Sequence, residues 1–177
     1  TNRCSNNCDF CIRHGREGMG DSKLWITEEP TTEDVLEQLP QNLDDYDEEV
    51  VFCGFGEPTY NLETLDEVAS YLHCKDKKTR INTNGQANLI HKRDVTDILV
   101  TGCDTINVSL NESTADKYQQ HCKSIFGKKA FDALVEFASL CRQRGGNVVD
   151  SIGEKDVEAC RKLAERMKIP LRVRRKE

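Results

Sequence analysis

Short strand-like runs alternate with helix-like runs along most of this chain, and this alternation limits the folds that it can adopt. The strand-like runs are either continuously apolar or alternate apolar and polar side chains with a period of two. Because short connections between successive strands and helices give parallel strands with right-handed crossovers, the pattern predicts an α/β sheet with outer helices. The predicted strands are residues 50–53, 79–83, 105–110, 147–149 and 171–173.

Five helices are predicted before or between these strands. In the second helix, Leu65 and Val68 lie on one apolar face. The last helix has Glu154 and Asp156 in its first turn, where the positive end of the helix dipole stabilises acidic side chains. Segment 145–149 is short for a helix-to-strand connection followed by a strand. The predicted helices are residues 35–39, 62–72, 90–99, 130–141 and 157–167.

We expect a single domain over residues 1–177 that forms a partial, open TIM-type barrel with a (βα)6-like order. The sequence shows five strands, and a sixth is expected upstream of Thr1. Since about eight strands close such a barrel, six leave it open along one side. In folds of this kind the chemistry takes place at the carboxyl ends of the strands. Four polar or glycine-rich segments fall at those ends: residues 4–11, 54–58, 84–85 and 111–112.

Composition and charge argue against several classes of function. The 177 residues carry a formal net charge of −6, so an overall basic surface for nucleic acid is not expected. A basic cluster over residues 172–176 is the local exception and is typical of a solvated end. No apolar run approaches the ~20 residues of a membrane helix. The nine cysteines, three of them close together, favour reduced thiols and a metal in the cytoplasm over a secreted disulfide scaffold.

Three cysteines near the N-terminus, Cys4, Cys8 and Cys11, have a C-x3-C-x2-C spacing. Three thiolates on one loop can bind an iron–sulfur cube and leave its fourth iron without a protein ligand, whereas a closed electron-transfer cluster uses four cysteines. The alternative is a structural zinc site, because His14 follows Cys11 closely enough to complete a Cys3His tetrahedron. The spacing alone leaves both kinds of metal centre open.

The other strand-end segments each have a functional and an ordinary interpretation. In segment 54–58 the glycines allow a ligand to approach the backbone, and Glu57 suits an ammonium group; a tight turn with a surface glutamate is the alternative. Asn84 belongs either to a ligand-binding strand end or to a simple Asn-Gly turn. Ser109 and Asn111 either contact a ligand or cap the end of their strand.

The cysteine motif, with the aromatic Phe10 before its last cysteine, resembles the signature of the radical S-adenosylmethionine (SAM) superfamily. In that family the three cysteines bind a [4Fe–4S] cluster, and SAM chelates the open iron. The resemblance implies that the reduced cluster cleaves SAM to a 5′-deoxyadenosyl radical, which abstracts hydrogen from a substrate. It also implies an electron donor such as a flavodoxin or ferredoxin.

The same resemblance assigns further residues to SAM. Segment 54–58 is similar to the family's GGEP motif, which binds the SAM amino group, although Phe55 stands in place of the first glycine of the doublet. Val149 and Asp150 lie where the family packs adenine. The implied catalytic cluster ligands are Cys4, Cys8 and Cys11, and the implied cofactor-binding residues are Phe10, Gly56, Glu57, Asn84, Ser109 and Asn111.

Similarity to one subfamily, the TatD-associated radical SAM proteins, extends over essentially the whole chain. The subfamily label describes a genomic association with a TatD-type nuclease and implies no substrate. Because the barrel is expected to be open, we expect a peptide or other large substrate, or a partner protein, to supply the missing wall. The alternative function is a non-catalytic zinc or iron–sulfur binding module. Cys53 and Cys122 are candidates for an additional catalytic cysteine. The similar segments are residues 1–4, 10–13, 51–59, 81–85, 108–111 and 169–174.

Overall fold

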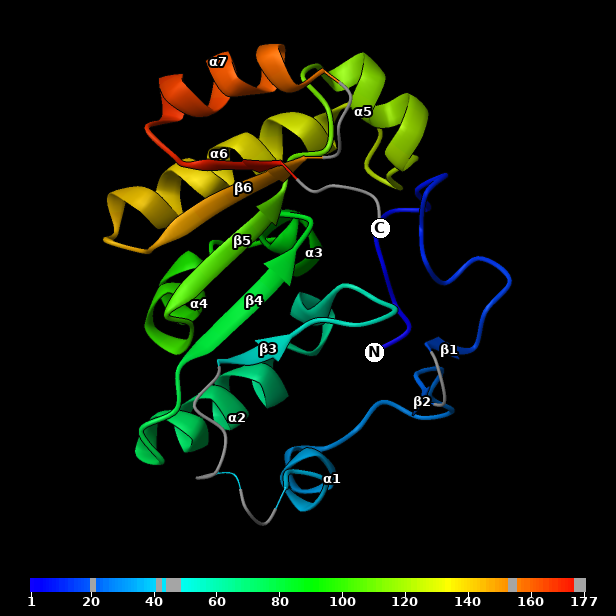
Figure 1. Cartoon of the computed structure of the whole chain (residues 1–177), viewed down its shortest axis with the longest axis vertical. Helices are drawn as coiled ribbons and strands as arrows, with labels where there is room; N and C mark the ends of the chain where they lie inside the picture. Colours follow the sequence, from blue (N-terminus) through cyan, green and yellow to red (C-terminus); the bar gives the residue numbers. More distant parts are fainter. Residues whose placement is uncertain (20–21, 41–42, 44–48, 153–155, 174–177) are drawn as a thin grey trace.

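Five parallel strands form the central sheet of the molecule (Figure 1). The computed structural model describes residues 1–19, 22–40, 43, 49–152 and 156–173, so Glu154 and most of the basic C-terminal cluster lie outside the described residues. The order in the sheet follows the chain, and every neighbouring pair is parallel. The strands are β3 (Val50–Phe52), β4 (Thr79–Thr83), β5 (Thr105–Ser109), β6 (Val148–Ile152) and β7 (Leu171–Val173).

The sheet is open. Within the described residues, β3 and β7 each pair with a single strand, so the two edges do not meet. This confirms the predicted open α/β architecture with parallel strands and outer helices. β6 runs to Ile152, beyond the predicted end at Val149, and residues 144–147 are enough to connect it to the preceding helix.

Three long helices lie where the sequence predicts them: α2 (Leu62–Cys74), α6 (Lys129–Gln143) and α7 (Val157–Met167). The shorter α1 (Thr32–Glu37) begins earlier than predicted, because the Thr31 side chain caps its N-terminus. The small elements outside this pattern are the 3-10 turn η2 (Pro58–Asn61) and the antiparallel pair β1 (Gly18–Met19) and β2 (Ser22–Lys23).

The single helix predicted over residues 90–99 is wrong. Two helices, α3 (Ala87–His91) and α4 (Thr96–Gly102), occupy this region with a turn between them. Lys92 ends α3 with a left-handed φ of 53°. Asp94 then accepts a hydrogen bond from the Thr96 backbone N at 3.0 Å, which satisfies a donor at the start of α4. Apolar residues recur at helix-like intervals through this turn, so periodicity alone does not reveal the break between the two helices.

One helix, α5 (Ala115–Cys122), is absent from the sequence prediction. The Thr114 side chain caps it by accepting a hydrogen bond from the backbone N of Lys117 at 3.4 Å. Only Tyr118 and Cys122 are buried, so the apolar stripe is too short to indicate a helix.

The two faces of the sheet differ in character. On one face Ile81, Ile106 and Val108 are fully buried in a cluster with apolar side chains of the helices, including Leu99 and Leu134. On the other face Asn107 donates a hydrogen bond to Asn82 Oδ1 at 3.0 Å, between residues that face each other in register. The helices therefore stabilise one face, and the carboxyl ends of the strands stay at a common edge.

That common edge is where the N-terminal segment runs. Figure 1 shows the arrowheads of β3, β4 and β5 pointing toward the side of the molecule where this segment, drawn in blue, passes close to α5. Among the described residues, no helix combines the length and the apolar character needed to cross a membrane.

Candidate active site

The cysteine-bearing loop is held against the C-terminal end of α5 by backbone hydrogen bonds. Asn7 N donates to the carbonyl of Cys122, and Asp9 N donates to the carbonyl of His121, both at 2.9 Å. In the return direction, Ile125 N donates to the carbonyl of Ser5 at 2.9 Å. These three bonds fix the path of the loop on either side of Cys8.

A network of buried polar side chains also holds the cysteine-bearing loop in place. The Asn6 side chain donates to the Tyr118 hydroxyl, and Gln86 Nε2 donates to both Asn6 Oδ1 and Tyr118, each at 2.9 Å. Ser124 donates to Gln86 Oε1 at 2.8 Å. All four side chains are buried, and satisfied polar groups in a buried network specify one arrangement. The sequence analysis predicted none of these four residues. The one sequence signal for Gln86 is its position next to the Asn84-Gly85 turn.

The Gly54–Pro58 turn contacts the residues just before the first cysteine. Glu57 N donates to the carbonyl of Arg3 at 2.8 Å. A Cβ on Gly56 would lie 2.3 Å from the carbonyl oxygen of Thr1 and 2.6 Å from that of Arg3. Only glycine allows this approach, so Gly56 lets the turn after β3 lie beside Cys4.

The Glu57 carboxylate joins the ends of β3 and β4. Its Oε1 accepts hydrogen bonds from the Thr59 backbone N (3.3 Å), the Thr59 hydroxyl (2.8 Å) and the Thr83 hydroxyl (2.7 Å), and its Oε2 accepts from Asn84 N (2.7 Å). The side chain is only 3% exposed. Burial raises the pKa of Glu57, and the hydrogen bonds oppose that shift. All of these donors are neutral groups.

Asn84 continues this chain of contacts to the first cysteine. Its Nδ2 donates to the Ser5 hydroxyl at 2.9 Å and lies 3.9 Å from Cys4 Sγ, while its Oδ1 accepts from Gln86 N at 3.0 Å. Asn6 N also donates to Cys4 Sγ, at 3.4 Å. Burial raises the pKa of the Cys4 thiol to about 11. The structure thus brings together three predicted site residues, Cys4, Glu57 and Asn84.

The second cysteine is in contact with a residue from α5. A hydrogen bond with Cys122 is the largest cause that lowers the pKa of the Cys8 thiol, and the pKa of Cys122 is raised in turn by that hydrogen bond and by burial. Asn111 Nδ2 donates to Cys122 Sγ at 3.8 Å. Asn111 follows β5 with a left-handed φ of 59°. Asn111, a fourth predicted site residue, is therefore linked to the cysteine loop through Cys122.

The remaining predicted residues are placed more loosely. Cys11 closes a turn through its N–H to the carbonyl of Cys8 at 3.1 Å, and Phe10 beside it is 54% exposed. Ser109 ends β5, opposite Ser151 in β6. His14, the zinc-ligand alternative, has its Nε2 3.1 Å from Asn7 Oδ1. In the described part of the chain, no three His, Cys, Asp or Glu side chains are grouped so that they could hold one metal ion.

The pair assigned to adenine packing is split between the two faces of the sheet. Asp150 lies on the same face of β6 as the core residues Val148 and Ile152, and its side chain is fully buried. Neither of its carboxylate oxygens has a hydrogen-bond partner. Burial raises the pKa of Asp150 to about 7. The strand alternation places Val149, but not Asp150, on the face opposite the helices.

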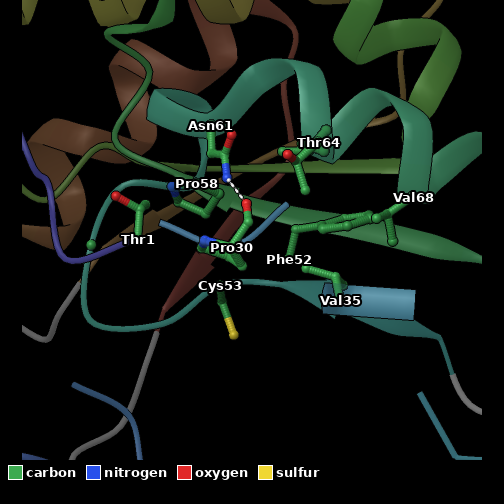
Figure 2. A pocket seen from close by; sticks show the side chains of 11 residues that line it. Thr1, Pro30, Val35, Phe52, Cys53, Pro58, Asn61, Thr64 and Val68 are labelled. Atoms are coloured by element: carbon green, nitrogen blue, oxygen red, sulfur yellow. Dashed lines mark hydrogen bonds between the residues drawn. The ribbon is translucent and has the colours of Figure 1, made fainter. Parts of the chain in front are cut away.

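Cys53 lies at the edge of a pocket of about 180 Å³ between β3 and the helices α1 and α2. Figure 2 shows its side chain pointing away from the Phe52 and Val68 side chains, and its thiol is exposed. The pocket is mostly apolar and also includes Gly56. Because Phe52 and Val68 line it, the pocket lies on the side of the sheet that the helices cover.

A comparison with protein families agrees with this geometry. The family model described as the radical SAM superfamily matches residues 1–153. The chain belongs to the radical SAM superfamily. No curated protein matches it.

Three solved structures share the fold of this chain, and one of them is described as a radical SAM methyltransferase. Streptococcus suis SuiB superposes with a TM-score of 0.73 at 18% identity, over 99% of this chain and 38% of SuiB. TYW1 with a lysine–pyruvate adduct bound gives 0.64 at 17%, over 99% and 62%. A radical SAM methyltransferase from Sphaerobacter thermophilus gives 0.65 at 15%, over 98% and 63%. This radical SAM chain therefore spans less than two thirds of each of these proteins, and the likeness concerns the fold.

Proposed function

We propose that this radical SAM chain binds a [4Fe–4S] cluster through Cys4, Cys8 and Cys11 and uses it for hydrogen abstraction. The observation that carries the proposal is the position of the three-cysteine loop, which the ends of β3, β4 and α5 hold from three sides. When bound and reduced, such a cluster supplies the electron that cleaves SAM to a 5′-deoxyadenosyl radical. The protein's own task is to hold both groups and to protect the radical from water.

The residues of the loop suit an iron–sulfur cluster. All three cysteines are free and partly exposed, so they are accessible to iron. Asn6 N and Asn84 Nδ2 point hydrogens toward Cys4 Sγ, and hydrogen bonds to ligand sulfurs stabilise their negative charge. Three thiolates leave one iron open for the amino and carboxylate groups of SAM. Cys4, Cys8 and Cys11 are thus the proposed catalytic residues.

The rim beside the loop suits the polar groups of SAM. Glu57 is a buried carboxylate whose hydrogen-bond donors are all neutral, so a cationic ligand would offset the cost of burying its charge. We assign the SAM ammonium to Glu57 and the neighbouring backbone of Gly56. Asn84, Ser109 and Asn111, at the ends of β4 and β5, are the proposed contacts for carboxylate and ribose, and Phe10 packs beside the cluster.

The proposal extends to the substrate and partners. Because β3 and β7 are open edges in the described structure, we propose that a peptide or other large molecule, or a partner protein, completes the wall of the site. As parts of the same proposal, we assign the chain to the TatD-associated subfamily and to the cytoplasm. We also propose that a flavodoxin or ferredoxin supplies its electrons.

Metal analysis of the complete chain tests the cluster. Anaerobic reconstitution with iron and sulfide should give about four irons per chain and the spectrum of a [4Fe–4S] cluster. Replacing Cys4, Cys8 and Cys11 together with Ala should abolish iron uptake. The exposed Cys74, on α2, provides the control: Cys74→Ser should load as the wild type does. Zinc in place of iron, or a full cluster in the triple variant, would contradict the proposal and favour a non-catalytic metal module.

A further inference from the structure

Cys122 is a buried cysteine that the proposed function does not use, and it lies opposite one of the cluster ligands. The residues on either side of Cys8 donate backbone hydrogen bonds to consecutive residues of α5: Asn7 to Cys122 and Asp9 to His121, both at 2.9 Å. Cys8 also packs against the core cluster that contains Cys122. These backbone bonds place Cys8 beside Cys122, and a hydrogen bond with the Cys122 side chain is the largest cause that lowers the pKa of Cys8.

The direction of that hydrogen bond follows from the groups around Cys122. A thiol has one hydrogen to donate and can accept at sulfur. Asn111 Nδ2 donates to Cys122 Sγ at 3.8 Å, so Cys122 already accepts one hydrogen bond, and a Cys8 thiolate bound to a cluster has no hydrogen and can only accept. Since Cys122 is fully buried, water does not compete for its hydrogen. The thiol hydrogen is left to point at Cys8 Sγ.

We propose that Cys122 is a positioning residue that donates a hydrogen bond from its thiol to the Cys8 sulfur of the cluster and thereby raises the cluster's reduction potential. This inference rests on the proposed [4Fe–4S] cluster. Reduction adds one negative charge to the cluster, and a hydrogen bond to a ligand sulfur stabilises the more negative state. Asn111, a proposed SAM contact, orients the Cys122 thiol through its own hydrogen bond to Cys122 Sγ. Two hydrogen bonds in series would therefore link the SAM side of the site to the cluster.

A redox titration of the cluster in the full-length, anaerobically reconstituted protein tests this. The midpoint potential is measured by electron paramagnetic resonance without SAM, for the wild type and for Cys122→Ala, Cys122→Val and Cys122→Ser. The Ala and Val variants should shift the potential to more negative values, because both lack the donor, although Ala is smaller than Cys and Val is larger. Cys122→Ser keeps a hydroxyl donor and should restore at least part of the shift.

The matched control is Cys141→Ala, which removes another fully buried thiol, on α6. It should leave the potential unchanged. Equal potentials in cluster-loaded wild type and Cys122→Ala would overturn the inference, and so would a Ser variant that shifts as far as Ala and Val, because packing would then be the cause. Failure of the wild type itself to take up iron would instead overturn the proposed function, and this inference with it.

Discussion

At the scale of single residues, the Glu57 carboxylate is the most constrained group in the site. Its two oxygens accept four hydrogen bonds, from Thr59, Thr83 and Asn84, so it holds the turn after β3 against the end of β4. In Glu57→Gln an amide NH2 replaces one acceptor oxygen and faces donors. We expect the free energy of unfolding to fall by roughly 1–3 kcal/mol and SAM to bind about ten-fold more weakly.

Urea unfolding and calorimetric titration with SAM measure the two effects separately. Glu63→Gln, at an exposed position in the first turn of α2, is the control and should change neither. A Glu57→Gln variant that is less stable but binds SAM with unchanged affinity would limit Glu57 to a structural role.

The second prediction at this scale is a pH dependence of stability caused by Asp150. Its buried carboxyl has no hydrogen-bond partner, and its pKa is raised to about 7. Between pH 4 and 7 the unfolded chain loses this proton while the folded chain retains it. The folded state is therefore destabilised as pH rises through this window, by at most roughly 4 kcal/mol for this group. Above pH 7 the cost is constant.

The variant Asp150→Asn cannot ionise and should lack this contribution. Urea unfolding at pH 5 and pH 8 should show a larger loss of stability for the wild type than for the variant. Parallel curves for the two proteins across this range would show that Asp150 finds a partner or solvent. Asp97→Asn, on the surface of α4, is the control for a surface carboxylate and should follow the wild type.

At the scale of elements, the function of α5 is to hold the cysteine loop. Tyr118 of α5 accepts hydrogen bonds from the buried amides of Asn6 and Gln86. Tyr118→Phe keeps the packing and removes the acceptor, so two buried N–H groups lose a partner. We expect a loss of roughly 1–3 kcal/mol and faster hydrogen exchange at the amides of Asn7 and Asp9, which depend on α5.

Hydrogen exchange followed by mass spectrometry, together with urea unfolding, checks this prediction. Tyr71→Phe is the matched control, because Tyr71 is 39% exposed on α2. If exchange at the loop did not change in Tyr118→Phe, the backbone bonds to Cys122 and His121 alone would be sufficient to order it.

The elements also show what a sequence can predict. Strands such as β4 alternate strictly between buried and partly exposed positions, and helices such as α2 carry long apolar faces, so both were predicted. Convergence of Cys4, Glu57 and Asn84 followed from the rule that parallel strands end at one edge. The helix α5 was missed because two buried side chains define too little periodicity.

The buried polar network could not be predicted for a different reason. Gln86 bonds Asn6 across 80 positions of sequence, and Asn6 bonds Tyr118 across 112. Such pairs leave no local pattern, because polar residues at these positions look like ordinary loop and helix surface. Asp150 is the converse case: a charged residue in a strand suggests an exposed position, yet it is fully buried among apolar neighbours.

At the scale of the whole molecule, an open sheet places its most stable part in the middle. β4, β5 and β6 have a strand on each side, whereas β3 and β7 are three-residue edge strands in the described structure. Hydrogen exchange should therefore be slowest in β4, β5 and β6 and fast in β3 and β7. Groups that bind at the carboxyl ends add stability there by mass action.

The last prediction separates the two places where a ligand could bind. SAM added to cluster-loaded protein should slow exchange in the segments at the carboxyl edge, residues 4–11, 54–57, 83–86 and 109–112, because it would contact several strand ends at once. The apolar pocket lined by Val35, Phe52 and Val68 lies on the helix-covered side and should not respond. The protein without the cluster serves as the control and should show weaker protection, because the open iron is then missing. Protection centred on α1 and α2, or equal protection with and without the cluster, would move the SAM site away from the three-cysteine loop.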